Sequence, residues 1–311
     1  MYILNINNKE YNLYESWSEI TLKKGRALFI EASKAPEDLL YIYKEQSKGE
    51  NADKDQIRIK EKALVQSELD EFYCAILSVL SNIPRSVISD INKDDLRTCY
   101  ERMLFHFVFG VLHFPVDGID TMDSFEFGGK KYIAPKSKEI LGSERPFYSE
   151  NVAVYCDASD LDTQGRSTNE GKYHFAELII AIIFKEYAVE YRKEEEAIEI
   201  AEQFKDVLTC DIFHSALHHL SAVNSKLNDL FPNLYRSSGN AKSKAASSES
   251  GLKDFGWFNS VLTIAEMQIL NKPGLTPLES VRYADLYNFM TVLSNMRANS
   301  DYQQLYKEKL K

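Results

Sequence analysis

Cysteine and histidine side chains recur along one stretch of the chain at the spacing of successive helical turns. Cys210, His214 and His218 stand at positions i, i+4 and i+8, with Asp211 and His219 beside them. Thiolate and imidazole are ligands that zinc prefers. Helical positions i and i+8 lie about 12 Å apart, however, too far for one tetrahedral ion. Only an adjacent pair such as His214 and His218 can chelate together, so we interpret the stretch as a structural helix face and predict no metal site.

Motifs that would indicate catalysis are absent from the sequence. It contains no Gly-x-Gly-x-x-Gly, no phosphate-binding lysine loop, no His-Glu-x-x-His and no Gly-x-Ser-x-Gly. Asp157, Asp160 and Asp162 resemble the start of a calcium loop. Asp162 stands where such a loop needs glycine, and Thr168 stands where it needs glutamate. The sequence therefore predicts no enzyme, no catalytic residue and no cofactor.

Composition and charge exclude several classes of protein. The chain is 44% hydrophobic and 27% charged, as in ordinary globular proteins, with four widely spaced cysteines that favour reduced thiols. It carries 37 basic and 47 acidic residues, a net charge of -10, so we expect no nucleic-acid partner. The apolar runs 103–116 and 178–184 are interrupted by histidine or too short to cross a bilayer, and no secretory signal begins the sequence. We expect no membrane association.

The elements that would position any site are mainly helices, with two small β-hairpins. Residues 3–14 contain two β-prone runs around Asn7-Asn8, and residues 124–135 repeat the design around Gly128-Gly129. Both hairpins continue into a Lys-x-Tyr sequence. Three interpretations fit this likeness: paired edges of one small sheet, a duplicated unit of hairpin followed by helices, or chance similarity of two generic hairpins. The predicted fold class is mainly α with two hairpins, an α+β arrangement.

Apolar periodicity predicts helices over most of the remaining chain. A capping box at Ser16 and Glu19 precedes a helix that starts after Thr21. The stretch of about thirty residues after the second hairpin, which includes residues 157–166, has no apolar period and contains turn formers and charges, which predicts a long surface loop. Further helices are predicted from residue 36 to 44, from 56 to 80, from 94 onward, from 170 to 191, and from 193 to about 230.

The chain is predicted to consist of three segments. Residues 1–236 form a helical body that carries both hairpins. Residues 237–251 contain no large apolar side chain and cannot offset their own ordering entropy, which predicts a flexible linker. Residues 252–311 form a C-terminal module of two helices, with Pro273 and Pro277 bounding the turn between them.

Two surface features suggest protein contacts. Phe255, Trp257 and Phe258 follow the linker directly, and their aromatic rings either dock within the chain or bury themselves on another one. Glutamates at 194–196, with Glu199 and Glu202, form an acidic helical face. That face is either simply solvated or binds a basic helix of a partner.

The order of elements resembles a group of tailed-bacteriophage proteins encoded in the tail and structural gene region. Leu13-Tyr-Glu-Ser-Trp17-Ser-Glu-Ile-Thr21 is similar to their helix start after a hairpin, with Tyr14 in place of the usual proline. The second hairpin, the helix at 178–184 and the run 191–204 are similar to later parts of those proteins. The segments 255–258 and 286–293 resemble their C-terminal ends.

This resemblance implies a non-enzymatic role like that of a tail assembly chaperone, which shields an aggregation-prone tape-measure helix until tube proteins arrive. Such a protein works in the host cytoplasm during assembly. The alternative is a virion structural or packaged cargo protein that makes fixed contacts with neighbouring subunits. In either case the expected partners are phage proteins, namely the tape measure, tail or other virion subunits. The residues assigned to partner binding are Trp17, Phe255, Trp257, Phe258 and Phe289.

Overall fold

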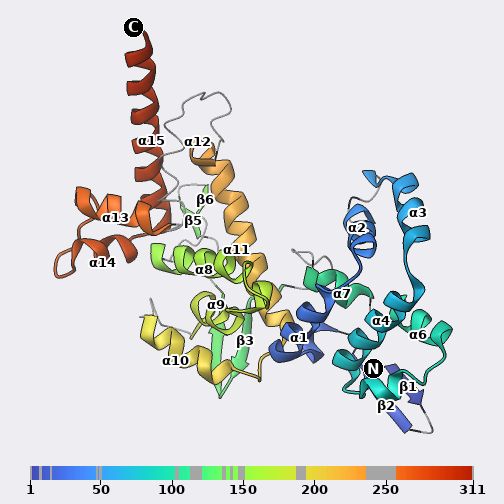
Figure 1. Ribbon diagram of the computed structural model, residues 1–311. Coiled ribbons are helices and arrows are strands. Elements are labelled where there is room, and N and C mark those ends of the chain that lie inside the picture. Colours follow the sequence, from blue (N-terminus) through green and yellow to red (C-terminus); the bar gives the residue numbers. More distant parts are fainter. Residues whose placement is uncertain are drawn as a thin grey trace. The chain divides into compact units, whose positions relative to one another are not determined.

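The protein is mainly helical and divides into two compact units (Figure 1). The computed structural model describes residues 2–6, 9–14, 16–46, 48, 51–101, 105–112, 121–134, 138–140, 143–145, 151–186, 194–235 and 257–309. The first unit comprises residues 1–120, 165–177 and 204–214, and the second comprises residues 121–164, 178–203 and 215–311. Among the described helices, none combines the length and the apolar character that crossing a membrane requires.

The first unit begins with a hairpin, which helices follow. Its elements are β1 (Tyr2–Ile6), β2 (Lys9–Leu13), η1 (Trp17–Glu19), α1 (Leu22–Ala32), α2 (Glu37–Gln46), α3 (Lys54–Ala63), α4 (Gln66–Ser81), α5 (Arg85–Ile88), α6 (Lys93–Cys99), α7 (Phe105–Leu112) and η4 (Gly171–Tyr173). The capping pair Ser16 and Glu19 starts the short η1, and Thr21 caps α1. The predicted helix after Thr21 is confirmed.

The core of the first unit forms where α1 packs against α4 and α7. Leu22 and Leu28 of α1 are fully buried there, as are Ile76 and Leu77 of α4. The segment just before α11 (Cys210–Leu230) is tied to the start of α1 by backbone hydrogen bonds, in which Leu22 N–H donates to the Leu208 carbonyl over 2.9 Å. Residues distant in sequence thereby reach α1.

The second unit holds the other hairpin and the C-terminal helices. Its elements are β3 (Ser124–Phe127), β4 (Lys130–Ile133), β5 (Lys138–Ile140), β6 (Ser143–Arg145), α8 (Val152–Gly165), most of α9 (Ala176–Ile183), β7 (Lys185–Glu186), α10 (Glu194–Phe204), the larger part of α11, α12 (Pro232–Tyr235), α13 (Phe258–Met267), α14 (Pro277–Arg282) and α15 (Leu286–Lys309). Phe125 stacks on Tyr132 of the neighbouring strand at 5.2 Å between ring centroids. Along α15, Leu286, Phe289 and Met290 are fully buried.

Both predicted hairpins are confirmed, but they do not share a sheet. In the first, Ile6 pairs with Lys9, and the turn residues Asn7 and Asn8 lie outside the described residues. In the second, Gly128 and Gly129 adopt positive φ values of 59° and 74°, which only glycine accepts at low cost. β1 and β2 form a two-stranded sheet, whereas β3 and β4 continue into β7. The hypothesis that the hairpins are paired edges of one sheet is therefore wrong.

The surface loop predicted after the second hairpin is wrong for residues 152–165, which form helix α8. Its aspartates, serine and glycine suggested a loop. Val152, Tyr155 and Ala158 recur every three residues, however, and all three are buried. Burial of this apolar stripe outweighs the low helix propensity of the polar residues between its members.

Two predicted helices end early or divide. The helix expected at 170–191 is α9, which ends at Ile183, because Lys185 and Glu186 form strand β7 against β4. An ion pair of 2.9 Å between Lys130 and Glu186 joins the same two strands. The helix expected at 56–80 is divided into α3 and α4 by extended backbone at Leu64 and Val65.

The remaining helical predictions need smaller corrections. The run at 193–230 is two helices, α10 and α11, separated near Asp206, which has a positive φ of 61°. The C-terminal module contains three described helices, α13 to α15, where two were expected. The predicted linker at 237–251 lies outside the described residues.

Candidate functional site

The five aromatic residues predicted to bind a partner lie in different environments. Trp17 is 7% exposed and Phe289 is fully buried. Trp257 is half-buried and Phe258 is 40% exposed. Phe255 lies outside the described residues. Because a buried side chain cannot contact a partner in this structure, Trp257 and Phe258 are the members of the set that remain available among the described residues.

Apolar side chains are exposed along α13 and the turn that follows it. Besides Phe258, Met267 is 49% exposed, Ile269 is 50% exposed and Leu275 is 37% exposed. Ile264 of the same helix is fully buried. α13 therefore packs one face into its own unit and presents apolar side chains elsewhere to solvent.

Trp257 connects α13 to helix α8, both in the second unit. The indole ring meets the ring of Tyr155 edge to face at 5.4 Å between centroids. The Trp257 backbone N–H donates to Asp160 Oδ1 over 3.5 Å, a long hydrogen bond. Trp257, which was predicted to bind a partner, therefore lies beside a helix in a region that was predicted to be a loop.

A cavity of about 250 Å³ opens beside α8, within the second unit. Leu161 of α8, Leu178 and Ile182 of α9, and Ala197 of α10 supply its apolar walls. Ligand pockets combine such walls with a few convergent polar groups. The cavity is therefore a candidate binding site, sized for a side chain or a small molecule.

Four charged residues line the same cavity: Asp157, Asp160, Lys185 and Arg282. Arg282 Nη2 and Asp157 Oδ2 form an ion pair of 2.8 Å, so these two charges compensate each other. Lys185 of β7 is 5% exposed. Asp160 forms no ion pair with the described lysines and arginines, and burial raises the pKa of its carboxyl group above the ordinary value. Asp160 is thus the carboxylate of this cavity that lacks a cation.

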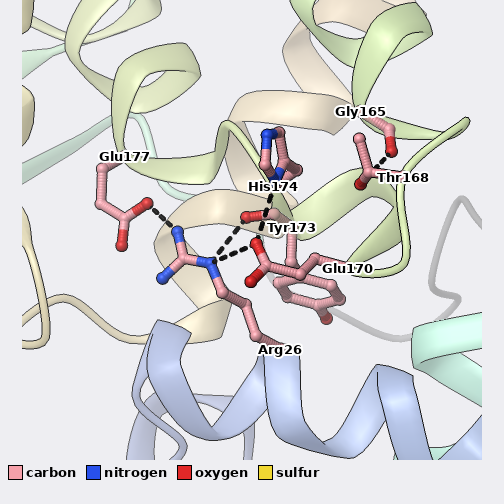
Figure 2. Close-up of polar contacts among 7 residues, drawn as sticks. All are labelled: Arg26, Gly165, Thr168, Glu170, Tyr173, His174 and Glu177. Atoms are coloured by element: carbon pink, nitrogen blue, oxygen red, sulfur yellow. Dashed lines mark hydrogen bonds and ion pairs between the residues drawn. The ribbon is translucent and has the colours of Figure 1, made fainter.

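A second polar site lies in the first unit, where Arg26 of α1 meets the segment around η4 (Figure 2). The Arg26 guanidinium donates to Glu177 Oε2 through Nη2 and to the Tyr173 carbonyl through Nε, the latter over 3.0 Å. Arg26 Nε also lies 3.6 Å from Glu170 Oε2, and the same oxygen is 3.0 Å from His174 Nδ1. Both carboxylates of this network therefore have a basic partner.

Close packing surrounds the Arg26 network. Gly171 has a positive φ of 55°, and a Cβ atom there would lie 2.2 Å from the ring of Phe29. A Cβ atom on Gly25 would lie 2.6 Å from Cys210 Sγ. A Glu170–His174 pair is of the type that acid–base catalysis uses. In this setting its bonds, with those of Arg26, fasten the η4 segment to α1.

Cys210 and His214 act in packing within the first unit. His214 is fully buried, its Nε2 lies 2.6 Å from the Tyr173 hydroxyl, and its ring meets Trp17 at 4.5 Å between centroids. Burial raises the pKa of the Cys210 thiol well above its usual range. Over the described part of the chain, no group of three His, Cys, Asp or Glu side chains is arranged to hold a metal ion.

We compared the chain with known protein families, curated proteins and solved structures. No protein-family model matches the chain, and neither the curated proteins nor the solved structures include a match.

The charged residues of the cavity were not predicted from the sequence. Asp157 and Asp160 resembled only calcium ligands in a loop, and no motif pointed to Lys185 or Arg282. The three-residue recurrence of Val152, Tyr155 and Ala158 was the available signal for α8. No local signal links α8 to Arg282, because only the tertiary fold brings them together.

Proposed function

We propose that this protein binds a helical polypeptide, such as a tape-measure protein, during assembly of a bacteriophage tail. It would act without catalysing a reaction, in the host cytoplasm while particles are assembled. The phage context comes from the resemblance of residues 13–21 and the later segments to proteins of the tail gene region. The observation that carries the binding role is the exposure of Phe258, Met267, Ile269 and Leu275 on α13 and its following turn.

These side chains suit contact with the apolar face of an amphipathic helix. An amphipathic helix docks by inserting apolar side chains spaced three or four residues apart between apolar side chains of its receptor. Met267 adds an unbranched, adaptable side chain of the kind found on surfaces that accept several sequences. Phe258 offers a large rigid ring, and aromatic side chains of this kind are enriched in protein interfaces.

The acidic face of α10 supports the same role. Glu195, Glu196, Glu199 and Glu202 are all exposed along it. With a net charge of -10, the chain favours a partner whose docking helix carries lysines or arginines. A basic amphipathic helix would therefore fit both the exposed apolar side chains of α13 and the acidic face of α10.

The proposal is tested by affinity purification of the tagged protein from host cells in which the phage replicates. We expect a long helical phage protein to copurify with the wild type, and the Phe258→Ser variant to capture at least about ten times less, as for loss of an interface anchor. Ile59→Ser is the matched control, since Ile59 is 57% exposed in the first unit. Equal capture by both variants, or no helical partner at all, would contradict the proposal.

Mass spectrometry of purified particles separates the chaperone from the alternative, a virion structural or packaged protein. A chaperone leaves before the particle is complete and should be absent from it. Stoichiometric presence in washed particles would favour fixed subunit contacts within the virion.

A further inference from the structure

The cavity beside α8 has the features of a receptor for one cationic side chain. We infer that it receives a lysine or arginine of the bound polypeptide, with Asp160 as the counter-ion; this inference rests on the proposed function. The aliphatic stem would lie against the apolar walls, and the charged head would reach the Asp160 carboxylate. Lysine and arginine side chains bury their stems in this way while keeping the charged end near polar groups.

Asp160 is the group that calls for a cation. Asp160 accepts one long hydrogen bond, from the Trp257 backbone N–H at 3.5 Å. The carboxylate is partly removed from water, which raises its pKa, and no neighbouring cation acts in the opposite direction. A carboxylate held in such surroundings gains more from a charge-assisted hydrogen bond than an exposed one does.

The other charged residues of the cavity are less suited than Asp160 to act as the counter-ion. Arg282 is paired with Asp157 at 2.8 Å. Lys185 also lines the cavity, but no ion pair joins its ammonium group to Asp160. The buried thiol of Cys156 responds to both aspartates, which raise its pKa further, while Arg282 lowers it. At the Cys156 thiol, the combined effect of the two carboxylates therefore outweighs that of Arg282.

Size and surroundings agree with a side chain as the occupant. The volume of about 250 Å³ accommodates an extended lysine or arginine side chain. Ala197 places the cavity wall on α10, whose exposed face carries the glutamates that favour a basic helix. Trp257, which contacts Asp160, adjoins the exposed Phe258 in sequence. One docking helix could thus use an apolar contact at Phe258 and a cationic contact at Asp160.

The test uses the full chain and small mimics of the two side chains, so that it does not depend on a partner. n-Pentylammonium and n-pentylguanidinium are titrated by ligand-observed NMR, with n-pentanol as the uncharged mimic. We expect both cations to bind the wild type at least about ten times more tightly than pentanol, and Asp160→Asn to remove that preference. Glu266→Gln, an exposed charge removal on α13, is the matched control and should bind as the wild type does.

A second variant covers the case in which Asp160→Asn fails to fold. Ala153→Leu fills the cavity from α8 without changing a charge, and it should abolish binding of all three mimics. Equal affinity for pentanol and the cations, or cation binding that survives both variants, would overturn the inference. The two proposals fail separately: a helical partner captured equally by the wild type and Asp160→Asn leaves the binding function standing, whereas cation binding without any captured partner removes the function alone.

Discussion

The two units use carboxylates in opposite ways. In the first unit, Glu177 and Glu170 both face Arg26, and the Arg26–Glu177 side chains are only 18% and 10% exposed. In the second unit, Asp160 is partly buried without a cation, although Asp157 beside it is paired with Arg282. A satisfied network fastens one segment to another, whereas an uncompensated carboxylate next to a cavity is available to a ligand. The contrast suggests a structural role for the first site and a binding role for the second.

The largest loss of stability is expected from adding a side chain at Gly171, next to the Arg26 network. Gly171→Ala should lower the free energy of unfolding by about 3 kcal/mol, because alanine disfavours a φ of 55° and its Cβ would lie 2.2 Å from the Phe29 ring. Gly128→Ala is the control: its φ is 59°, but no atom lies within 4 Å of the added Cβ. That variant should lose only about 1 kcal/mol. Both free energies of unfolding are measured by urea denaturation. Equal losses in the two variants would show that the contact of Gly171 with Phe29 of α1 is not the cause.

Removing the cation of the network should have the next largest effect. Arg26→Leu leaves Glu177 buried without its partner and should cost about 2–3 kcal/mol. The double variant Arg26→Leu/Glu177→Leu should regain at least half of that loss, because no charge then remains buried. Chemical denaturation of the wild type, both single variants and the double variant measures the coupling. A double variant that is less stable than Arg26→Leu would argue against a paired, structural network.

The ion pair of Asp70, in the first unit, should affect how the stability of the protein depends on pH. Lys93 and Gln66 hold the pKa of Asp70 below its ordinary value, through contacts of 2.7 and 2.8 Å. The folded state therefore gains stability at neutral pH and loses it as the pH falls through the lowered pKa. Asp70→Asn should be less stable than the wild type at pH 7, by less than about 1 kcal/mol, with the difference vanishing in acid. A difference that persists below pH 3 would exclude this cause.

For Asp160 the pH dependence of stability should have the opposite sign to that for Asp70, and its size should be the smallest of these effects. Its pKa is raised in the folded state, so the folded protein binds the proton more tightly than the unfolded chain does. Stability contributed by the protonated form is present in acid and is lost as the pH rises through the raised pKa. Asp160→Asn should therefore match the wild type in acid and gain on it above about pH 4, by no more than about 0.5 kcal/mol. A variant that becomes less stable with rising pH would indicate an unrecognised cation beside Asp160.

Local sequence patterns predicted the elements whose conformation depends on near neighbours. The Gly128-Gly129 turn follows from the freedom of glycine at positive φ, and the helix after Thr21 follows from its cap. Predictions were wrong where distant residues decided the outcome. Lys185 and Glu186 form a strand only because β4 lies beside them, and residues 157–165 are helical because one stripe of α8 is buried.

The sequence by itself determined a mainly helical, acidic chain with two hairpins and without familiar catalytic motifs, because composition, periodicity and turn residues act over short range. Only the tertiary structure decided which charges meet. Arg26 reaches Glu177 and Arg282 reaches Asp157 across long stretches of chain, while Asp160 is left beside a cavity. Pairing and desolvation are properties of the assembled unit, since the strength of a charge interaction depends on the distance and the surroundings that folding creates.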